Sequence, residues 1–308
     1  MKILVTGGAG YIGSVLVPML LNDGYDVRVF DNLSYGQSSM LPYFIDDHFE
    51  FIKGDIRDVK AVKKAVDGTD AIIHLAAIVG APGCNKDPVL AREVNYQGTV
   101  NVNRARTGQK LIYASTGSVY GKVDGICTEK SPANPLSVYG ETKLMAEKEV
   151  LRSGNAIAYR FATAFGLSSK LRLDLLPNYF VFNALKDKHL VIYDRDFKRT
   201  FVHVKDIARS YLFGLKHFAA MKNKVYNVGS EKINKTKGEI ADLMREKIDF
   251  EIYCANENIP DPDQRDYEVS YQKIRDIGFK TKISFERGVD EMINGLKHLD
   301  IKNPYSNV

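Results

Sequence analysis

Near its N-terminus the sequence reads Ile3-Leu-Val-Thr-Gly-Gly-Ala-Gly-Tyr-Ile-Gly13. The first residues of this segment, 3–5, are a short apolar run that predicts a buried strand. Residues 14–21, directly after the glycines, are mostly apolar and predict a helix that is interrupted by Pro18 and ends near Gly24. The chain is therefore expected to begin with a strand, a glycine turn and a helix.

The glycines between this strand and this helix predict a phosphate-binding turn. They fit two registers, Gly8-x-Gly10-x-x-Gly13 and Gly7-x-x-Gly10-x-x-Gly13. Glycines permit a tight turn and a close approach of the backbone to a pyrophosphate, and the helix N-terminus offers free N–H groups and a positive dipole end. A glycine triplet alone is a weak sign, but its place directly after a strand makes a dinucleotide the expected ligand.

An acidic residue stands where the second strand of such a unit ends. Residues 25–30 alternate in polarity and predict that strand, and Asp31-Asn32 closes it about 20 residues after the glycines. A carboxylate there bonds both ribose hydroxyls of NAD and repels the 2′-phosphate of NADP, so NAD is the expected cofactor. The alternative is that Asp31 only caps the turn after the strand, as Asp often does.

Farther along, the sequence repeats the alternation of strand and helix. Apolar or alternating runs predict strands at 49–53, 71–75 and 110–114, and the intervening segments predict helices at 58–66 and 87–105. This pattern is typical of an α/β protein with a doubly wound parallel sheet, the Rossmann fold. In such a sheet the groups after each strand face one crevice, here Asp31, Asp55, Ala76, Ala77, Ser115 and Thr116.

Composition excludes several classes of protein. Of the 308 residues 44% are hydrophobic and 26% are charged, as in an ordinary globular protein. The net charge is +5 without a dense basic tract, which fits an anionic small molecule and argues against a nucleic-acid partner. No apolar stretch approaches ~20 residues, so no membrane partner is expected. The strand predicted from residue 2 leaves no room for a signal peptide, and three cysteines far apart in sequence indicate a cytoplasmic location and no metal site.

Tyr139 and Lys143 stand four residues apart in a segment that predicts a helix starting near Ser137. This spacing places both side chains on one face of the helix. An ammonium beside a phenol lowers the pKa of the phenol, so that the phenolate can act as a base near neutral pH, and Thr116 can hydrogen-bond the same substrate hydroxyl. The alternative for such a pair is a solvated surface helix, but the dinucleotide-binding pattern before it favours catalysis.

Several segments, in the same order, resemble the extended short-chain dehydrogenase/reductases that act on nucleotide sugars. They run over about two-thirds of the chain: Thr6-Gly-Gly-Ala-Gly-Tyr-Ile-Gly13, Asp31-Asn-Leu33, Gly54-Asp55, His74-Leu-Ala-Ala77, Ser115-Thr-Gly-Ser-Val-Tyr-Gly121, Tyr139-x-x-x-Lys143 and Arg199-Thr-Phe-Val-His-Val-Lys-Asp206. The resemblance implies an NAD-dependent enzyme with Thr116, Tyr139 and Lys143 as its catalytic triad. It also implies a set of cofactor-binding residues: Gly7, Gly10, Tyr11, Ile12, Gly13, Asp31, Asn32, Asp55, Ile56, Leu75, Ala76, Ala77, Asn95, Ser115, Tyr139, Lys143 and Phe161.

Two departures from the family pattern narrow the reaction. Sugar 4,6-dehydratases usually carry Asp-Glu right after the catalytic Thr, and UDP-glucuronate decarboxylases usually carry an acid at the second of these positions; here Gly117 and Ser118 stand there. Arg160-Phe-Ala-Thr163 replaces the Arg-Tyr-Phe-Asn of many relatives and resembles a narrower branch, which includes NAD-dependent GDP-heptose 4-dehydrogenases. This likeness, which implies oxidation at C4 of the sugar, extends over the segments 79–84, 164–178 and 261–270.

The C-terminal third leaves the alternating pattern. It contains short predicted elements only: helices at 207–217, 236–247 and 284–298 and strands at 224–228 and 250–253. We expect two domains, in which residues 1–166 plus 200–230 bind NAD. Residues 167–199 plus 231–308 are expected to form a smaller α+β lobe that closes over the crevice and binds the nucleotide sugar.

Candidate substrate-binding residues lie mostly in this smaller lobe. Guanidinium groups bind phosphate oxygens in a bidentate manner, so Arg172, Arg199 and Arg265 are candidates for holding the substrate diphosphate. The alternative for each is an ordinary surface arginine. Likeness to the family adds the other expected members of this set: Val79, Gly117, Ser118, Thr163, Leu173 and Asn178.

The expected enzyme is thus an NAD-dependent nucleotide-sugar oxidoreductase. Tyr139 takes the proton of the C4 hydroxyl held by Thr116, hydride passes from C4 to the nicotinamide, and Lys143 lowers the tyrosine pKa and bonds the nicotinamide ribose. A 4-epimerase returns the hydride on the other face of the 4-keto sugar, whereas a 4-dehydrogenase, or in reverse a ketoreductase, exchanges it; the sequence fits both. The rival is a non-catalytic dinucleotide-binding sensor or partner protein, which would not need the three residues together. The family's habit of pairing the helices at 95–103 and 139–151 implies a homodimer.

Overall fold

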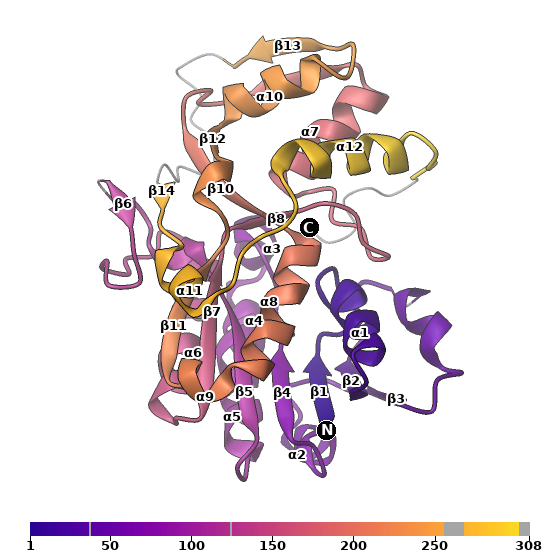
Figure 1. Ribbon diagram of the computed structural model, residues 1–308, viewed down its shortest axis with the longest axis vertical. Helices are drawn as coiled ribbons and strands as arrows, with labels where there is room; N and C mark the ends of the chain where they lie inside the picture. Colours follow the sequence, from indigo (N-terminus) through magenta and orange to yellow (C-terminus); the bar gives the residue numbers. More distant parts are fainter. Residues whose placement is uncertain (37, 124, 256–267, 302–308) are drawn as a thin grey trace.

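The strand that precedes the glycine turn lies inside a parallel sheet (Figure 1). The computed structural model describes residues 1–36, 38–123, 125–255 and 268–301. The strands of the main sheet are β1 Lys2–Thr6, β2 Asp26–Asp31, β3 Phe49–Lys53, β4 Ala71–His74, β5 Lys110–Thr116, β7 Ala156–Phe161 and β11 Lys224–Val228. Within the described residues these seven lie in the order β11-β7-β5-β4-β1-β2-β3, and neighbouring strands are parallel. The predicted α/β, doubly wound Rossmann fold is confirmed.

The register of the sheet brings the carboxyl ends of its central strands to one edge. Thr6 at the end of β1 pairs with Phe30 on β2 and with His74 on β4, and Thr116 at the end of β5 pairs with Phe161 on β7. Because all strands point the same way, the segments that follow them meet at this edge. The groups predicted to share a crevice are therefore brought together.

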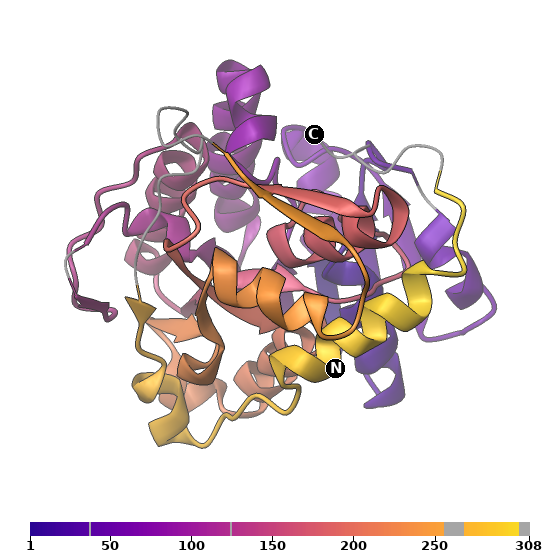
Figure 2. The same ribbon diagram turned by 90° about the horizontal axis from the view of Figure 1, so that it is seen from above.

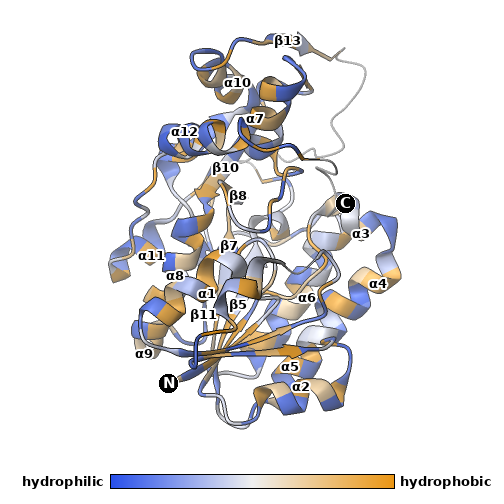
Figure 3. Cartoon of the chain, turned by 90° about the vertical axis from the view of Figure 1, so that its right-hand side faces the viewer, coloured by the Kyte–Doolittle hydropathy of each residue, from blue (hydrophilic) through white to orange (hydrophobic). Residues whose placement is uncertain are grey.

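Helices cover both faces of the main sheet (Figures 1 and 3). Their bounds are α1 Gly13–Asn22, α2 Val59–Val66, α3 Ala81–Lys86, α4 Pro88–Arg92, the π-helix η2 Glu93–Gly98, α5 Thr99–Ala105, α6 Val138–Arg152, α8 Val204–Lys216, α9 Phe218–Met221 and α11 Gln272–Ile277. Helices α1 and α8 pack together on one face, and α2, α5 and α6 pack on the other. In the described ranges no helix is both long and apolar enough to cross a membrane.

Two predicted helices differ from expectation in detail. Helix α1 runs through Pro18 without a break, so the predicted interruption is wrong; buried Leu16, Val17 and Leu20 hold the helix against the sheet on both sides of the proline. The helix predicted at 87–105 is helical throughout, but its middle turn is the π-helix η2. The widened turn places Asn95 in the interior of the protein.

An upper lobe stands over the carboxyl edge of the sheet (Figures 1 and 2). It is built from β8 Thr163–Phe165, β9 His189–Ile192, β10 Lys198–His203, β12 Asn234–Thr236, β13 Glu251–Cys254, α7 Leu176–Lys186, α10 Lys237–Arg245 and α12 Phe285–Leu296. Strands β12-β10-β8 and β13-β9 form two small sheets, and α7 packs against both α10 and α12. The remaining short elements are η1 Ser38–Tyr43, η3 Gly117–Val119, η4 Glu231–Ile233, β6 Ile126–Cys127 and β14 Glu268–Val269.

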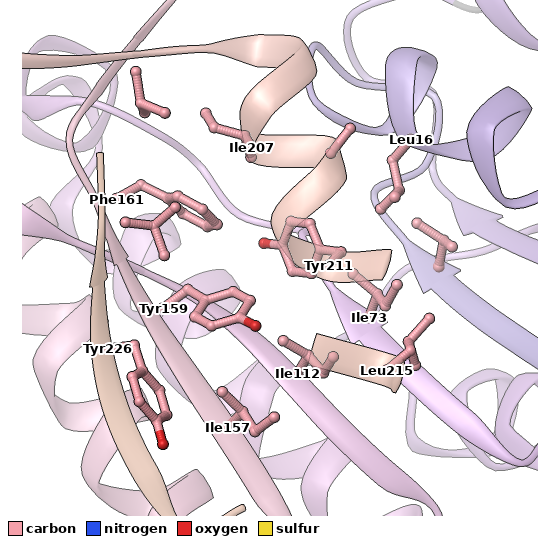
Figure 4. Packing of buried hydrophobic residues seen from close by; sticks show 14 of the residues in the cluster. Leu16, Ile73, Ile112, Ile157, Tyr159, Phe161, Ile207, Tyr211, Leu215 and Tyr226 are labelled. Atoms are coloured by element: carbon pink, nitrogen blue, oxygen red, sulfur yellow. The ribbon is translucent and has the colours of Figure 1, made fainter. Parts of the chain in front are cut away.

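Each part has a hydrophobic core of its own. In the main domain α8 presses Tyr211 onto the sheet beside Tyr159 and Phe161, with ring centroids 5.6 Å apart in both pairs (Figure 4). In the upper lobe Phe285 lies 5.0 Å from Phe165 and 5.5 Å from Phe201 between ring centroids. Phe165 and Phe201 thus pack with the upper lobe, whereas Val202 packs with the core of the main domain. The domain boundaries predicted at 166 and 200 lie close to these residues and stay a prediction.

Candidate active site

A cavity of about 740 Å³ lies between the carboxyl edge of the sheet and the upper lobe. Most of the residues predicted to bind the cofactor or to catalyse line it: Gly7, Gly10, Tyr11, Ile12, Gly13, Asp31, Asn32, Asp55, Ile56, Leu75, Ala76, Ala77, Ser115, Thr116, Tyr139, Lys143 and Phe161. Four predicted substrate-binding residues also line it: Val79, Ser118, Thr163 and Arg172. The sequence therefore identified the wall of one common cavity.

The glycine turn forms the part of the wall between β1 and α1. Gly7 has a φ of +73°, and a Cβ atom there would lie 2.6 Å from the backbone nitrogen of Ala76. A Cβ at Gly13 would lie 2.3 Å from the carbonyl oxygen of Gly8. Side chains are thus excluded where the backbone crosses the sheet edge, and the N-terminus of α1 faces the cavity, as pyrophosphate binding requires.

Asp31 stands at the end of β2 with its carboxylate fixed by the backbone. One oxygen accepts a hydrogen bond from Ala9 N at 3.0 Å and the other from Leu33 N at 2.8 Å. Burial raises the pKa of this carboxyl above its ordinary value, although the two backbone bonds oppose the rise. The carboxylate is held on the cavity wall one strand away from the glycine turn, at the position predicted for the NAD ribose.

The next strand end carries a second, more polar group. Asp55 is paired with Arg57 at 2.9 Å and accepts a hydrogen bond from Asn32 Nδ2 at 3.3 Å. The Arg57 side chain lowers the pKa of the Asp55 carboxyl to about 2, so it is ionised at all ordinary pH values. Asp55, Asn32 and Ile56 border the cavity on the far side of Asp31 from β4, the place expected for an adenine.

Asn95 does not line the cavity but holds one of its walls. It is 1% exposed, and its side-chain amide binds the backbone of Ile78 twice, at 2.8 Å to the nitrogen and 2.9 Å to the oxygen. His74, at the end of β4, is buried between Thr6 and Thr99, and burial lowers its pKa to about 3. Asn95 thus fixes the position of Ile78, and His74 ties the end of β4 to Thr6 and Thr99.

The three predicted catalytic residues converge on this cavity. Thr116 ends β5, and its hydroxyl accepts a hydrogen bond from Ser118 N at 3.1 Å. Tyr139 and Lys143 lie on α6, whose N-terminus is capped by the Ser137 side chain. A Cβ atom at Gly140 would lie only 2.7 Å from the carbonyl oxygen of Ser118, so this glycine lets the helix approach the end of β5. This close approach was not predicted from the sequence.

Lys143 lies deep in the cavity. Its side chain is nearly inaccessible to solvent, and burial lowers its pKa to about 7 against the opposing influence of Cys84 and Glu147. A lysine with this pKa can lose or gain its proton near neutral pH. It is therefore suited to respond electrostatically when a neighbouring phenol ionises.

A buried ion pair supports the end of β5 from behind. Arg160 donates to Glu147 at 2.6 and 3.0 Å, and the Ser115 hydroxyl donates to the same carboxylate at 2.5 Å. Ser115 precedes Thr116, so the pair fixes the strand end that presents the threonine. Glu147 was missed by the sequence analysis; the signal was a charged residue on the sheet-facing side of an otherwise apolar helix stripe.

The other predicted substrate-binding residues do not line the cavity. Arg199 and Leu173 are buried in the upper lobe, Asn178 is bonded to backbone groups, and Gly117 is buried in η3. Arg265 lies outside the described residues. Lys170 and Tyr35, which were not predicted, border the cavity near Arg172, and Lys170 donates to the carbonyl of Tyr35. Within the described part of the chain, no cluster of His, Cys, Asp and Glu suited to a metal ion occurs.

Comparison with known proteins identifies one enzyme family by sequence and by structure. The model of the NAD dependent epimerase/dehydratase family matches residues 3–229. A UDP-glucose 4-epimerase of Lactobacillus helveticus is 31% identical over 257 residues, which cover 75% of this chain and 77% of the relative. The crystal structure of Thermus thermophilus UDP-glucose 4-epimerase in complex with NAD superposes with a TM-score of 0.85 at 27% identity, over 97% of this chain and 99% of that one. The crystal structure of DesIV, a dTDP-glucose 4,6-dehydratase from Streptomyces venezuelae, superposes with a TM-score of 0.81 at 26% identity, over 96% of this chain and 96% of that one.

Proposed function

Because the chain belongs to the NAD-dependent epimerase/dehydratase family, we propose that it interconverts the C4 epimers of a nucleotide-diphosphate sugar. It is an NAD-dependent enzyme of the extended short-chain dehydrogenase/reductase type. The observation that carries the proposal is the convergence of Thr116, Tyr139 and Lys143 in the cavity that the glycine turn and Asp31 border. A proton acceptor and the predicted dinucleotide site thus share one cavity.

Each member of the triad has a separate part in the proposed reaction. NAD, when bound, accepts a hydride from C4 of the sugar and can return it. Tyr139, as phenolate, takes the proton of the C4 hydroxyl as that hydroxyl becomes a ketone, and gives the proton back when the opposite epimer forms. Thr116 orients the hydroxyl by hydrogen bonding. Lys143 stabilises the phenolate, and its low pKa lets it share the change of charge.

Dehydration is not favoured as the reaction. Elimination of water from a 4-keto sugar needs an acid and a base beside the ketone. The positions after Thr116 are Gly117 and Ser118, and neither supplies a carboxyl group. The likeness to a 4,6-dehydratase therefore reflects the shared fold, whereas the residues of the site favour simple oxidation and reduction at C4.

A UDP-hexose is the substrate that we favour over a GDP-heptose, because two of the three relatives named above are UDP-glucose 4-epimerases and none acts on a GDP-sugar by its name. Of the arginines predicted to hold the diphosphate, Arg172 lines the cavity. Its guanidinium donates to the carboxylate oxygens of Asp174 at 2.6 and 2.5 Å, which orients it. We assign Arg172 to binding the diphosphate. This contact would anchor the nucleotide while the 4-keto sugar rotates to present its other face to the nicotinamide. Ser118, Thr163 and Val79 border the remaining space and are assigned to the sugar side.

A homodimer is part of this proposal. The outer surface of α4 and η2 is partly apolar: Val89 is 70% exposed, and a shallow hollow there is bordered by Val89, Tyr96 and Val138. Tyr96 and Val138 belong to the two long helical segments that pair in dimers of related enzymes. A second copy of the chain would cover this surface with the same elements.

The test starts from the protein as isolated. Denaturation should release NAD, identified by mass, and incubation with UDP-glucose should give UDP-galactose without net NADH. Net NADH, or turnover only with an added keto acceptor, would make the enzyme a 4-dehydrogenase instead. Tyr139→Phe should retain NAD and lose turnover by about two to four orders of magnitude; full activity of this variant would refute the mechanism and favour a non-catalytic dinucleotide-binding protein.

A further inference from the structure

Asn178 was predicted to touch the substrate, but its side chain is committed elsewhere. It lies on α7 and is 1% exposed. Its Oδ1 accepts from Gly166 N at 3.0 Å, and its Nδ2 lies 2.9 Å from the carbonyl oxygen of Arg172, 3.3 Å from that of Gly166 and 3.4 Å from the Tyr11 hydroxyl. These partners use the acceptor and the donor side of the amide. One side chain therefore joins the glycine turn to the upper lobe.

Tyr11 supplies the cofactor side of this junction. It stands inside the glycine turn, and its hydroxyl donates to the Gly166 carbonyl at 2.7 Å, across 155 residues of sequence. The ring is buried, and burial raises the pKa of the phenol above its ordinary value, so the hydroxyl remains a neutral donor. The turn that would hold the pyrophosphate is thus tied to the first residue beyond β8.

Arg172 supplies the substrate side. Its guanidinium is oriented by Asp174, while its backbone carbonyl accepts from Asn178. The side chain is therefore fixed from both ends: Asp174 sets the direction of the head group, and Asn178 sets the position of the backbone from which it extends. A cation that lines a ligand cavity gains affinity from such preorganisation.

Gly166 is the fixed point that both sides share. Its φ is +104°, and a Cβ atom there would lie 2.2 Å from Nε2 of His203. His203 is in turn paired with Glu291 of α12 at 2.7 Å. Any other residue at 166 would be strained and would collide with His203. The tight packing fixes the Gly166 backbone, to which the Asn178 side chain is hydrogen-bonded.

We propose that Asn178 is a positioning residue that sets the distance between the cofactor turn at Tyr11 and the substrate cation Arg172. Binding of NAD and binding of the nucleotide are then coupled through one amide. The substrate half of this inference rests on the proposed function, because it takes Arg172 to hold the diphosphate. The cofactor half rests only on the Tyr11 and Gly166 contacts and on the NAD-dependence of the family.

The test compares three variants of the NAD-loaded protein. Asn178→Ala removes both connections, and Tyr11→Phe removes only the cofactor-side donor. Asn183→Ala is the matched control, since Asn183 is also a buried asparagine on α7 and does not line the cavity. The measurements are the rate of NAD release, the Kd of UDP or GDP (whichever the wild type binds) by calorimetry, and the Tm.

We expect Asn178→Ala to speed NAD release and to raise the nucleotide Kd, each by about tenfold, because buried polar groups lose their partner. Tyr11→Phe should speed NAD release but leave the Kd within about twofold, and Asn183→Ala should leave both within about twofold. The inference is overturned if Asn178→Ala changes neither quantity, or if Asn183→Ala changes both as much. If the wild type binds neither nucleotide, the proposed substrate class fails, while the NAD-release comparison still decides the role of Asn178.

A second variant keeps the test decisive if Asn178→Ala does not fold. Asn178→Asp has the same shape, but as a carboxylate it turns an acceptor toward the carbonyl of Arg172. Lowering the pH should protonate this buried carboxyl, restore one donor and bring NAD release back toward the wild-type rate at the same pH. A purely structural role would give no such rescue, and its absence would contradict the inference.

Discussion

Lys143 lies on the face of the Tyr113 ring, with its ammonium nitrogen 4.2 Å from the ring centroid. Tyr113 is fully buried on β5, and its hydroxyl lies 3.5 Å from the carbonyl oxygen of the same lysine. The aromatic face offers the cation some stabilisation, but it does not replace lost hydration. Burial therefore prevails and lowers the pKa of Lys143 to about 7.

This shift predicts a pH dependence of stability. The folded-state pKa of about 7 lies below the value of 10.5 that an ordinary lysine has, so between these pH values the unfolded chain binds the extra proton. Stability of nucleotide-free protein should therefore rise with pH in this window, by up to about 1.4 kcal/mol per pH unit, relative to Lys143→Met. Urea unfolding of both proteins at pH 7, 8.5 and 9.5 measures the difference, and parallel curves would contradict the burial argument.

Gly140→Ala should separate the catalytic helix from the end of β5. The added Cβ would meet the carbonyl oxygen of Ser118 at 2.7 Å, so α6 must shift away from Thr116. A shift of this kind lowers turnover by about 10- to 100-fold with NAD still bound. Glu141→Ala, at the exposed next position, serves as the control and should retain most activity. Wild-type turnover in Gly140→Ala would show that the close approach is not required.

Asp31→Asn should weaken the preference for NAD. The amide has the size of the carboxylate but no charge, so the ribose hydroxyls lose a charged acceptor and a 2′-phosphate is no longer repelled. NAD affinity should fall by about tenfold while NADP affinity rises, because hydrogen bonds to charged groups are the stronger ones. Titration of both nucleotides measures the ratio, with exposed Asp47→Asn as the control; an unchanged ratio would assign Asp31 to capping alone.

Glu291→Gln should change the response to acid. Pairing with His203 and Lys205 outweighs burial and lowers the Glu291 pKa from 4.5 to about 2. Its contribution is therefore complete above pH 4.5 and is lost as the pH falls toward 2. The variant should be less stable at neutral pH and should lose less stability between pH 4.5 and 2 than the wild type. Denaturant titrations at several pH values test this, and equal losses would count against the ion pairs.

The features predicted correctly from the sequence are those with a local cause. The turn at Gly7–Gly13 and the carboxylate of Asp31 follow strands directly, so a few neighbouring residues are enough to predict them. Helical spacing places Tyr139 and Lys143 on one face of α6, and the dinucleotide-binding pattern before them favours a catalytic role over a surface helix. The strand order then brings these local features together, because parallel strands end at one edge.

The features that were missed depend on partners far away in sequence. Asn178 looks like a substrate ligand until its bonds to Tyr11, Gly166 and Arg172 are seen. Strand β7 was not predicted, because Arg160 interrupts its apolar residues and the wholly buried strand has no regular polar alternation. Arg160 within it would be costly if unpaired, and only the fold reveals that Glu147 neutralises it.

The way in which β8, β10 and α12 combine has a consequence for engineering. Phe165, Phe201 and Phe285 meet in one cluster, although long stretches of chain separate them. The upper lobe is therefore no contiguous cassette, and a chimera that receives only one segment from a relative would pair mismatched halves of this cluster. Exchange of sugar preference between relatives will require at least three segments to be transplanted together, with Gly166 kept as the shared junction.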